Sequence, residues 1–438
     1  MKIAIVGTGI SGLVCAHLLH PDHDVTVFEA NDYVGGHTHT VEVEVGGRVH
    51  AVDTGFIVYN ERNYPAFTGL LAELGVATQP SVMSFSVRDE RRGLEYRGDG
   101  FGGLYAQPAN LASPRFQRML VDILRFNRRA RRLLDRHRAA TEAGDTATAD
   151  ALDDLSLHDL VDAGRHGADF TSHFLVPLGS AIWSADPERF TDFPAVTYAR
   201  FMDNHGLLRV RGGPRWRTVT GGSQRYVDAL IAPFADRIRL GTPVTKIQRR
   251  RLTDGTTEIE VLSSPVGPER FDRVVLAGHS DQALRLLSDP SPSERDILGA
   301  LRYQPNVATL HTDDRFLPRR DAARASWNAH VGTAARTPDG QPAASLTYWM
   351  NQLQSIDCER PILVTLNRHD EIDPAAVLGR YEYDHPVFDV GALRAQRRRA
   401  EIQGGDGTYF AGAYWGYGFH EDGVQSALDV CRSLEAQR

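Results

Sequence analysis

The stretch that decides the fold of this 438-residue chain is Lys2-Ile-Ala-Ile-Val-Gly7-Thr-Gly9-Ile-Ser-Gly12. An apolar strand runs directly into the pattern G-x-G-x-x-G, and apolar residues at helical spacing then continue to His20. Gly7 permits a tight turn, Gly9 lets a phosphate approach the backbone, and Gly12 lets a helix lie close to the strand. The stretch therefore predicts the first half of a dinucleotide-binding βαβ unit.

The second half of this unit ends on an acidic residue. The strand Asp24-Val-Thr-Val-Phe leads to Glu29, about twenty residues past the glycines, where a carboxylate accepts hydrogen bonds from a ribose. The helix between the strands starts at the phosphates, so its free N–H groups and its dipole face negative charge. Together these features predict a Rossmann-like cofactor domain in an α/β fold.

Composition narrows the class of protein. A net charge of −7 disfavours nucleic acid as a partner. The three cysteines form neither a disulfide framework nor a zinc-ligand spacing, so no metal site is expected. No apolar run is long enough to span a membrane, and the first strand begins at residue 2 without a signal peptide. These observations predict a cytoplasmic protein.

Further glycine-rich segments recur along the chain. Gly35-Gly-His-Thr38 follows the acidic residue, and Asp53-Thr-Gly-Phe-Ile57 supplies another place where backbone can pass close to a ligand. A Gly-Gly pair at residues 221–222 precedes a predicted helix and a strand that contains Val244. Near the end, Gly412 is followed by Phe419-His-Glu-Asp-Gly-Val424 and an apolar helix.

These motifs resemble the FAD-binding amine oxidase and phytoene desaturase superfamily. The resemblance implies that Val244 meets the adenine through its backbone and that the last helix points its N-terminus at the flavin, where negative charge accumulates on reduction. No cysteine lies within residues 414–422, so the FAD is expected to be non-covalent. The expected cofactor-binding residues are Gly7, Gly9, Ile10, Ser11, Gly12, Glu29, Ala30, Gly35, Gly36, His37, Thr38, Thr54, Gly55, Phe56, Ile57, Val244, Gly412, Phe419, Glu421, Asp422, Gly423 and Val424.

One cofactor position departs from the superfamily pattern. His37 stands where these proteins usually carry an arginine after the Gly-Gly pair. A neutral imidazole is a weaker partner for a diphosphate than a guanidinium group. Part of the phosphate charge must therefore be met elsewhere in the protein.

The cofactor motifs lie in three separate regions, which predicts two domains. We expect an FAD-binding domain of the GR2 type from residues 1–79, 211–284 and 403–438. Residues 80–210 and 285–402 then form a discontinuous α+β substrate domain over the flavin, as the resemblance also implies.

The expected chemistry is transfer of a hydride from a substrate C–H bond to the flavin. Many amine oxidases carry a lysine near the flavin, whereas the matching segment here has Asn306, so a standard amine oxidase is less expected. His420 falls where the superfamily has a cage tyrosine; it can take a proton, or only hydrogen-bond to backbone or flavin, and both roles stay open. The expected catalytic residues are His420, Tyr59 and Asn60.

Residues 115–134 predict a basic amphipathic helix. One interpretation is a helix that rests on an anionic membrane surface and admits a lipid. The other is a helix packed on the core with solvated arginines. The expected apolar face consists of Phe116, Met119, Leu120, Ile123, Leu124, Leu133 and Leu134.

The motifs look most like a bacterial subgroup of the superfamily that is associated with cyclopropane fatty acid synthase-like methyltransferases. Some members are linked to desaturation of methyl-branched acyl chains on the route to furan fatty acids. This implies a hydrophobic or lipid substrate, a methyltransferase as functional partner and contact with the inner membrane face. The alternatives are an amine or amino acid oxidase, a carotenoid-type desaturase, and a non-catalytic flavin-containing lipid-binding partner of a methyltransferase.

Overall fold

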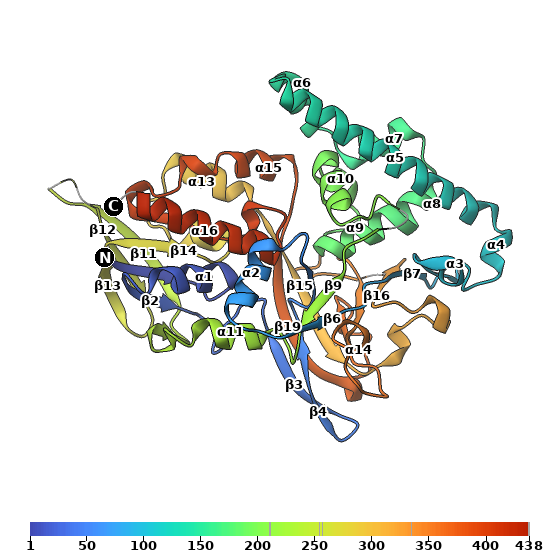
Figure 1. Cartoon of the computed structure of the whole chain (residues 1–438), viewed down its shortest axis with the longest axis horizontal. Coiled ribbons are helices and arrows are strands. Elements are labelled where there is room, and N and C mark those ends of the chain that lie inside the picture. The colour runs from blue at the N-terminus through green and yellow to red at the C-terminus, as the bar shows by residue number, and fades with distance from the viewer. Residues whose placement is uncertain (210–211, 254, 256, 334, 437–438) are drawn as a thin grey trace.

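Two β-sheets organise the computed structural model, which describes residues 1–209, 212–253, 255, 257–333 and 335–436. A five-stranded sheet lies on the side that holds the N-terminus, and a seven-stranded sheet lies on the other side beneath a group of helices (Figure 1). The predicted α/β architecture with a separate sheet-rich domain is confirmed. The predicted domain boundary at residues 210–211 lies outside the described residues.

The five-stranded sheet gathers segments that are far apart in the sequence. Its order is β10-β2-β1-β14-β20, and every neighbouring pair of strands is parallel. A parallel strand covered on both faces reads as a continuous apolar run, and Ile3, Ala4 and Ile5 are all fully buried. The strands are β1 (Lys2–Val6), β2 (Asp24–Phe28), β10 (Ile238–Arg239), β14 (Arg273–Leu276) and β20 (Thr408–Phe410).

Two helices pack closely against this sheet and against each other. Helix α1 (Ile10–Leu19) connects β1 to β2, and helix α16 (His420–Ala436) ends the described chain. A Cβ on Gly12 would lie 2.0 Å from the carbonyl oxygen of Gly7, and a Cβ on Gly423 would lie 2.6 Å from Cγ2 of Ile10. The hydroxyl of Ser11 donates to the carbonyl of Gly423 at 3.0 Å, so α1 and α16 meet through glycine and serine.

The opposite face of the parallel sheet carries a second core. The meander β11 (Val244–Arg251), β12 (Thr257–Ser263) and β13 (Gly267–Phe271) packs there with helices α12 (Ser280–Leu286), α13 (Pro292–Ala300) and α15 (Val390–Arg397). Ile297 and Ala392 are both fully buried in this cluster. Residues 285–301 and 390–402 were predicted to belong to the substrate domain. Their apolar side chains instead pack on the second face of the cofactor sheet.

The seven-stranded sheet forms the floor of the second domain. Its order is β19-β15-β18-β17-β16-β7-β8, antiparallel except where β16 pairs with β7. The hairpin β3 (Thr40–Val45) and β4 (Arg48–Asp53) leaves the cofactor segment and packs its valines on this sheet. The seven strands are β7 (Phe85–Asp89), β8 (Leu94–Arg97), β15 (Tyr303–His311), β16 (Trp327–Val331), β17 (Leu346–Trp349), β18 (Leu363–Leu366) and β19 (Val377–Pro386).

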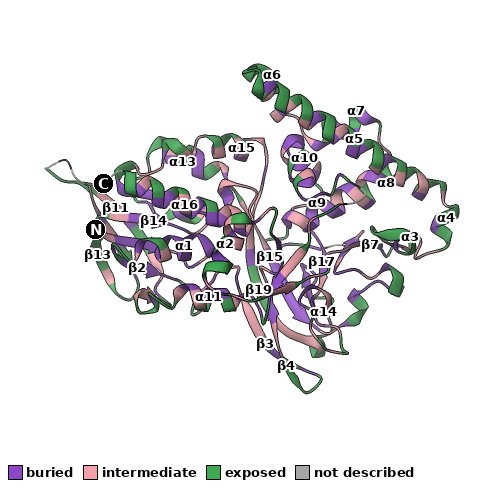
Figure 2. Ribbon diagram, viewed as in Figure 1, coloured by how far each residue is buried: buried purple, intermediate pink, exposed green. Residues whose placement is uncertain are grey.

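Helices α3 to α10 cover one end of this sheet. The longest, α5, runs over Pro114–Glu142, and the Ser113 hydroxyl caps it by accepting from the Phe116 N–H at 3.3 Å. Figure 2 shows that α5 buries one side and exposes the other. Leu124, predicted on the apolar face of this helix, is 45% exposed. The other helices are α3 (Gly100–Leu104), α4 (Ala109–Ala112), α6 (Thr146–Asp153), α7 (Leu157–Gly164), α8 (Ala168–Phe170), α9 (Val176–Trp183) and α10 (Ala195–Asn204).

Three short strands and two helices join the domains. Strands β5 (Tyr59–Asn60), β9 (Trp216–Val219) and β6 (Thr78–Pro80) form a small antiparallel sheet. Helices α2 (Pro65–Glu73) and α11 (Gln224–Ile231) pack beside α16 and α1. Within the described residues, no helix has both the length and the apolar character needed to cross a bilayer.

Candidate active site

The first turn of α1 lies at the carboxyl ends of the parallel strands. Gly7 has φ +105° and turns the chain from β1 into the helix, whose N-cap is Gly9. A second loop reaches the same point, because a Cβ on Gly36 would lie 3.3 Å from Cα of Gly9. Ligands of open parallel sheets bind at this edge, so both loops lie where the sequence predicts the diphosphate.

The acidic residue after β2 lies beside this turn. The Glu29 carboxylate is buried and accepts from the Thr8 N–H at 2.9 Å and from the Asn31 N–H at 2.9 Å. Among the described residues, its Oε1 accepts the second of these bonds alone, so that oxygen keeps a lone pair for a ribose hydroxyl. The Thr242 N–H donates to the Glu29 carbonyl at 2.8 Å, which brings the segment before Val244 next to Glu29, as expected for an adenosine site.

Space for a cofactor exists where the motif requires it. A Cβ on Gly9 would meet no atom within 4 Å, although Gly7, Gly12 and Gly36 are all in close contact with their neighbours. The α1 N–H groups lie at this open position, and the Thr8 N–H, which donates to Glu29, places the Glu29 carboxylate beside the same turn. The residues present therefore fit the diphosphate and ribose of FAD, and FAD at this place would supply the flavin as an acceptor of hydride.

The two predicted glycine loops lie side by side. The Phe56 N–H donates to the His37 carbonyl at 2.8 Å. A Cβ on Gly55 would lie 2.2 Å from that same oxygen, so only glycine fits there. The loops at residues 35–38 and 54–57 are therefore brought together, although the Ile57 side chain packs with the seven-stranded sheet and can contribute only backbone.

The acidic residues at the start of α16 contact protein through their side chains. The Glu421 carboxylate accepts from the Ala66 and Phe67 N–H groups at 3.1 and 3.0 Å and so caps α2. The Asp422 carboxylate accepts from the Phe419 N–H at 2.9 Å, and burial raises its pKa to about 7. These residues can therefore offer a flavin only their backbone N–H groups, which a helix N-terminus leaves free.

His420 is held on several sides. Its Nε2 lies 3.0 Å from both the Thr38 hydroxyl and the Tyr226 hydroxyl. Its ring stacks on Phe56 with centroids 3.6 Å apart, and burial lowers its pKa to about 3. A neutral imidazole with Nε2 bound to two hydroxyls favours the hydrogen-bonding role over that of an accessible base.

The other two catalytic candidates lie farther from His420. Tyr59 packs edge-on against Phe67, which in turn packs edge-on against His420, so an aromatic ring stands between the two candidates. Asn60 is fully buried, and its side-chain oxygen Oδ1 accepts from the Asn63 N–H at 2.9 Å. Among the described residues, its Nδ2 has no hydrogen-bond partner.

Sequence reasoning missed two histidines of this region. His279 follows β14, and its ring stacks on Tyr303 with centroids 4.2 Å apart. His385 lies on β19 and accepts from Asn306, the residue at the expected lysine position, with Nδ1 and Nδ2 3.0 Å apart. A residue at the carboxyl end of a parallel strand is a recognisable candidate, so His279 could have been found. His385 comes from an antiparallel edge strand and has no such signal.

A hollow lined in part by aromatic side chains, here called the aromatic groove, lies between residues 183–193, the start of β15 and the end of β19. It has a volume of about 310 Å³, within the usual range for small-molecule sites. Trp183 also donates from Nε1 to the Tyr417 carbonyl at 3.2 Å, which joins α9 to the segment before α16. The aromatic and flanking residues of the groove are Trp183, Phe190, Phe193, Tyr303, Pro386, Val387 and Phe388.

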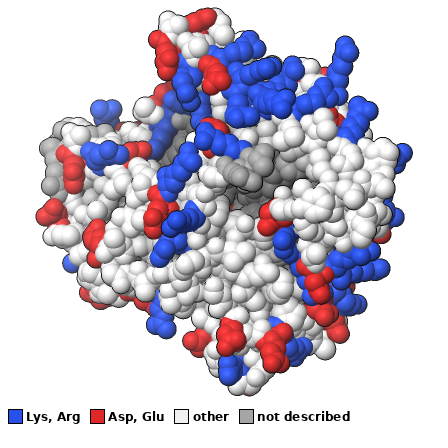
Figure 3. All heavy atoms as spheres, turned by 45° about the vertical axis from the view of Figure 1, so that its right-hand side comes forward, with Lys and Arg blue, Asp and Glu red and all other residues white. Residues whose placement is uncertain are grey.

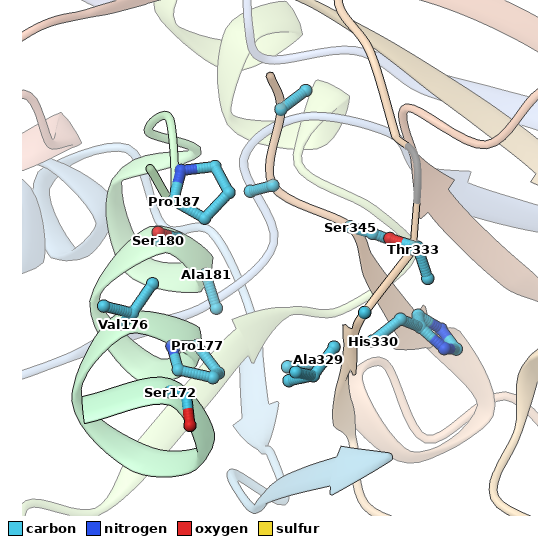
Figure 4. Close-up of a pocket in the computed structure, with 14 residues that line it drawn as sticks. Ser172, Val176, Pro177, Ser180, Ala181, Pro187, Ala329, His330, Thr333 and Ser345 are labelled. Carbon is cyan, nitrogen blue, oxygen red and sulfur yellow. The ribbon is translucent and has the colours of Figure 1, made fainter. Parts of the chain in front are cut away.

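A second cavity lies between α9 and β16. Figure 4 shows Val176, Pro177 and Ala181 on the helix facing Ala329 across it. Its volume of about 110 Å³ is small for an organic substrate. The aromatic groove is therefore the better candidate for substrate binding.

A family model described as flavin containing amine oxidoreductase matches residues 10–434. The chain belongs to this family. The sequence predicted FAD as the cofactor and an FAD-dependent oxidoreductase as the class of enzyme. Both agree with the cofactor and the enzyme class of the family. The three cysteines of this protein are free, and Cys15 and Cys431 are buried between α1 and α16.

Individual relatives agree with this assignment. The flavin-containing monoamine oxidase AofH of Mycobacterium tuberculosis is 29% identical over 255 residues, which is 57% of this chain and 52% of that protein. The match thus spans about half the length of that relative. Putrescine oxidase has the same fold with a TM-score of 0.68 at 18% identity, covering 100% of this chain and 99% of the other. A fatty acid isomerase from P. acnes that produces CLA has a TM-score of 0.67 at 15% identity, with 98% of each chain covered.

Two glycine variants separate folding from cofactor binding. We expect Gly12→Ala to lower the free energy of unfolding by about 3 kcal/mol or more, because its Cβ meets backbone that cannot move away. We expect Gly9→Ala to fold normally, since Gly9 has φ −63° and ψ 171° and open space around it. Its methyl group should instead raise the Kd for FAD at least about tenfold. Urea unfolding of flavin-free protein and fluorescence titration with FAD measure the two effects; normal FAD affinity in Gly9→Ala would place the diphosphate elsewhere.

Proposed function

We propose that this protein is an FAD-dependent oxidoreductase that desaturates or oxidises a hydrophobic substrate, an unsaturated or methyl-branched fatty acyl chain. The observation that carries the proposal is the aromatic groove. Aromatic and aliphatic side chains line it alongside charged and amide side chains, and the lining includes Tyr303 and Pro386, next to His279 and His385 of the cofactor region. Another protein with this fold, the P. acnes isomerase, is a fatty acid isomerase.

Charged residues at the rim of the groove suit an acyl chain with an anionic head group. Arg189 and Arg302 line the groove, and their side chains are 66% and 53% exposed. Each has a carboxylate neighbour, Asp192 at 3.7 Å and Asp389 at 2.6 Å. These pairs are solvated and weak, so an incoming carboxylate or phosphate can compete for the guanidinium groups.

The reaction removes two hydrogens from adjacent carbons of the chain. Bound FAD would supply the acceptor for one hydrogen as a hydride, the other would leave as a proton, and a double bond would form between the two carbons. The protein's part is to bind the chain against the aromatic side chains of the groove. His420 acts by holding Thr38 and Tyr226 in place beside Phe56 rather than by taking the proton.

An amine or amino acid oxidase is the second candidate. The family description favours it, and the aromatic groove contains Asp186, whose pKa burial raises. A carboxylate there can pair with an ammonium group. Against it, Asn306 stands at the lysine position and its amide is engaged, with Oδ1 accepting from Asn367 Nδ2 at 2.8 Å. A carotenoid-type desaturase and a non-catalytic lipid-binding partner of a methyltransferase are the remaining alternatives.

Substrate-dependent bleaching of the flavin tests the proposal. We expect an unsaturated or methyl-branched acyl lipid to reduce the flavin under anaerobic conditions, and simple amines to leave it oxidised. Prompt reduction by an amine and none by any acyl lipid would reverse the order of the two candidates. Reduction by neither would favour the non-catalytic alternative.

A charge placed in the groove should weaken acyl binding. We expect Val387→Asp to raise KM for the acyl substrate at least about tenfold, or about 1.4 kcal/mol, while FAD content stays unchanged. The matched control is Val49→Asp on the β3–β4 hairpin, where Val49 is 64% exposed. Equal KM values for the two variants would show that the substrate does not occupy the groove.

We also propose that α5 docks on an anionic membrane and so gives the enzyme access to its lipid. Arg side chains gather on the outer face of the helical domain (Figure 3). Val121 and Leu124 are 55% and 45% exposed on the same helix, and Phe101 on α3 is 72% exposed. Basic side chains interspersed with exposed apolar ones suit the headgroup region of a bilayer. The exposed arginines of α5 are Arg115, Arg118, Arg125, Arg128, Arg131, Arg132, Arg136 and Arg138.

Reversing three of these charges should abolish docking. Arg128, Arg132 and Arg136 are four residues apart on one helical face, and the described residues place no carboxylate within 4.0 Å of them. Each basic residue contributes about 1 kcal/mol near an anionic surface, so replacing all three by Glu should weaken co-sedimentation with phosphatidylglycerol vesicles at least about a hundredfold. A control that replaces the exposed Arg48, Arg270 and Arg432 by Glu carries the same net charge. Equal sedimentation of the two triple variants, or none of the wild type, contradicts the proposal.

A further inference from the structure

Three imidazoles from separate elements meet in the cofactor region. The ring of His37 lies 6.1 Å from that of His279 and 5.5 Å from that of His385, centroid to centroid. His37 belongs to the Gly-Gly loop, His279 precedes α12, and His385 lies on β19. Together they are called here the imidazole cluster, and among the described residues they form no group that could hold a metal ion.

The cluster borders the open position at the start of α1. Gly36, which precedes His37, would place a Cβ 3.3 Å from Cα of Gly9. Ala277, two residues before His279, has its carbonyl oxygen 3.1 Å from a Cβ built on Gly7. The two loops that carry these histidines therefore touch the glycine turn from different sides, and the diphosphate of a dinucleotide at that turn lies within their reach.

The cluster carries no charge in the cofactor-free protein. Burial lowers the pKa of His37 and of His279 to about 4, and that of His385 to about 3. Each of the three residues nevertheless keeps part of its surface accessible. Side chains that are deep in the protein yet accessible face an internal space, so a ligand in that space contacts neutral imidazoles.

The other groups that face the cluster offer it little charge. Tyr303 stacks on His279, Tyr383 packs on His37, and His420 is a neutral neighbour. The Asp384 carboxylate lies 3.8 Å from Nδ1 of His279 and can stabilise a proton there. On α12, Asp281 favours the charged form of His279 and Arg285 opposes it.

A bound diphosphate changes this balance. It brings two negative charges that persist throughout the neutral pH range, and an anion at close range favours protonated imidazole. His37 stands where the superfamily pattern has a guanidinium group, and a proton on the cluster would supply a positive charge in its place.

We propose that the imidazole cluster is the cationic part of the FAD diphosphate site and takes up protons when the cofactor binds. A group that gains protons on binding strengthens binding at low pH, and this gain is lost as pH rises through the pKa of the complex. FAD affinity should therefore fall from acidic to alkaline pH. This inference is independent of the substrate proposed above.

Titration of flavin-free protein with FAD between about pH 5.5 and pH 8.5 tests the proposal. We expect the Kd to rise with pH, by up to about tenfold per unit for each proton taken up. Calorimetry in buffers of different ionisation enthalpy should show net proton uptake. ADP, which has the diphosphate but no flavin, should show the same pH dependence, and riboflavin should show none. A Kd for FAD that does not depend on pH overturns the proposal, as does a dependence for FAD that is absent for ADP.

Variants locate the protons. His37→Gln and His279→Gln should each reduce the pH dependence and weaken FAD binding chiefly at acidic pH. His37→Arg supplies a permanent charge, so it should flatten the profile and tighten binding at alkaline pH. His158→Gln on α7, where the His158 side chain is 64% exposed, is the control and should behave as wild type. Full pH dependence in both glutamine variants, or an unchanged profile in His37→Arg, contradicts the assignment.

Discussion

The close contact of α1 with the turn that precedes it is the constraint on which the rest of the molecule depends. Gly12 lies so near the Gly7 carbonyl that no side chain fits between them, and Gly423 lets α16 approach the Ile10 side chain of α1. This packing holds the first turn of α1 at the carboxyl edge of five parallel strands. The loops that carry Gly36 and Gly55, and the start of α16, are then positioned against a rigid edge.

Around this edge the protein is largely neutral. The imidazoles of the cofactor region have pKa values well below their usual range, and burial raises the pKa of Asp422 to about 7 and that of Asp53 to about 6. Asp53 nevertheless accepts from the Ser223 N–H at 2.8 Å and from Gln354 Nε2 at 2.9 Å, which ties the cofactor loops to the second domain. A neutral, hydrogen-bonded cavity leaves the charge of the cofactor to set the protonation of its surroundings.

Much of the fold was predictable because its signals are local. The glycine pattern, Glu29 and the segments around Gly221 and Gly412 each report a turn or strand from nearby residues alone. The packing of α13 and α15 on the cofactor sheet was not predictable, since an apolar helix face does not indicate which core will receive it. Glu421 was likewise predicted to bind the cofactor, but its side chain caps α2, a helix that lies more than 350 residues earlier in the sequence.

The sequence by itself determined the dinucleotide site, because each glycine there answers a steric demand of its immediate neighbours. It also determined the class of cofactor, through the order of the motifs along the chain. Only the tertiary structure decided the surroundings of His420 and the meeting of His37, His279 and His385. Those contacts join residues up to several hundred positions apart, and the burial that sets their protonation exists only once both domains have packed together.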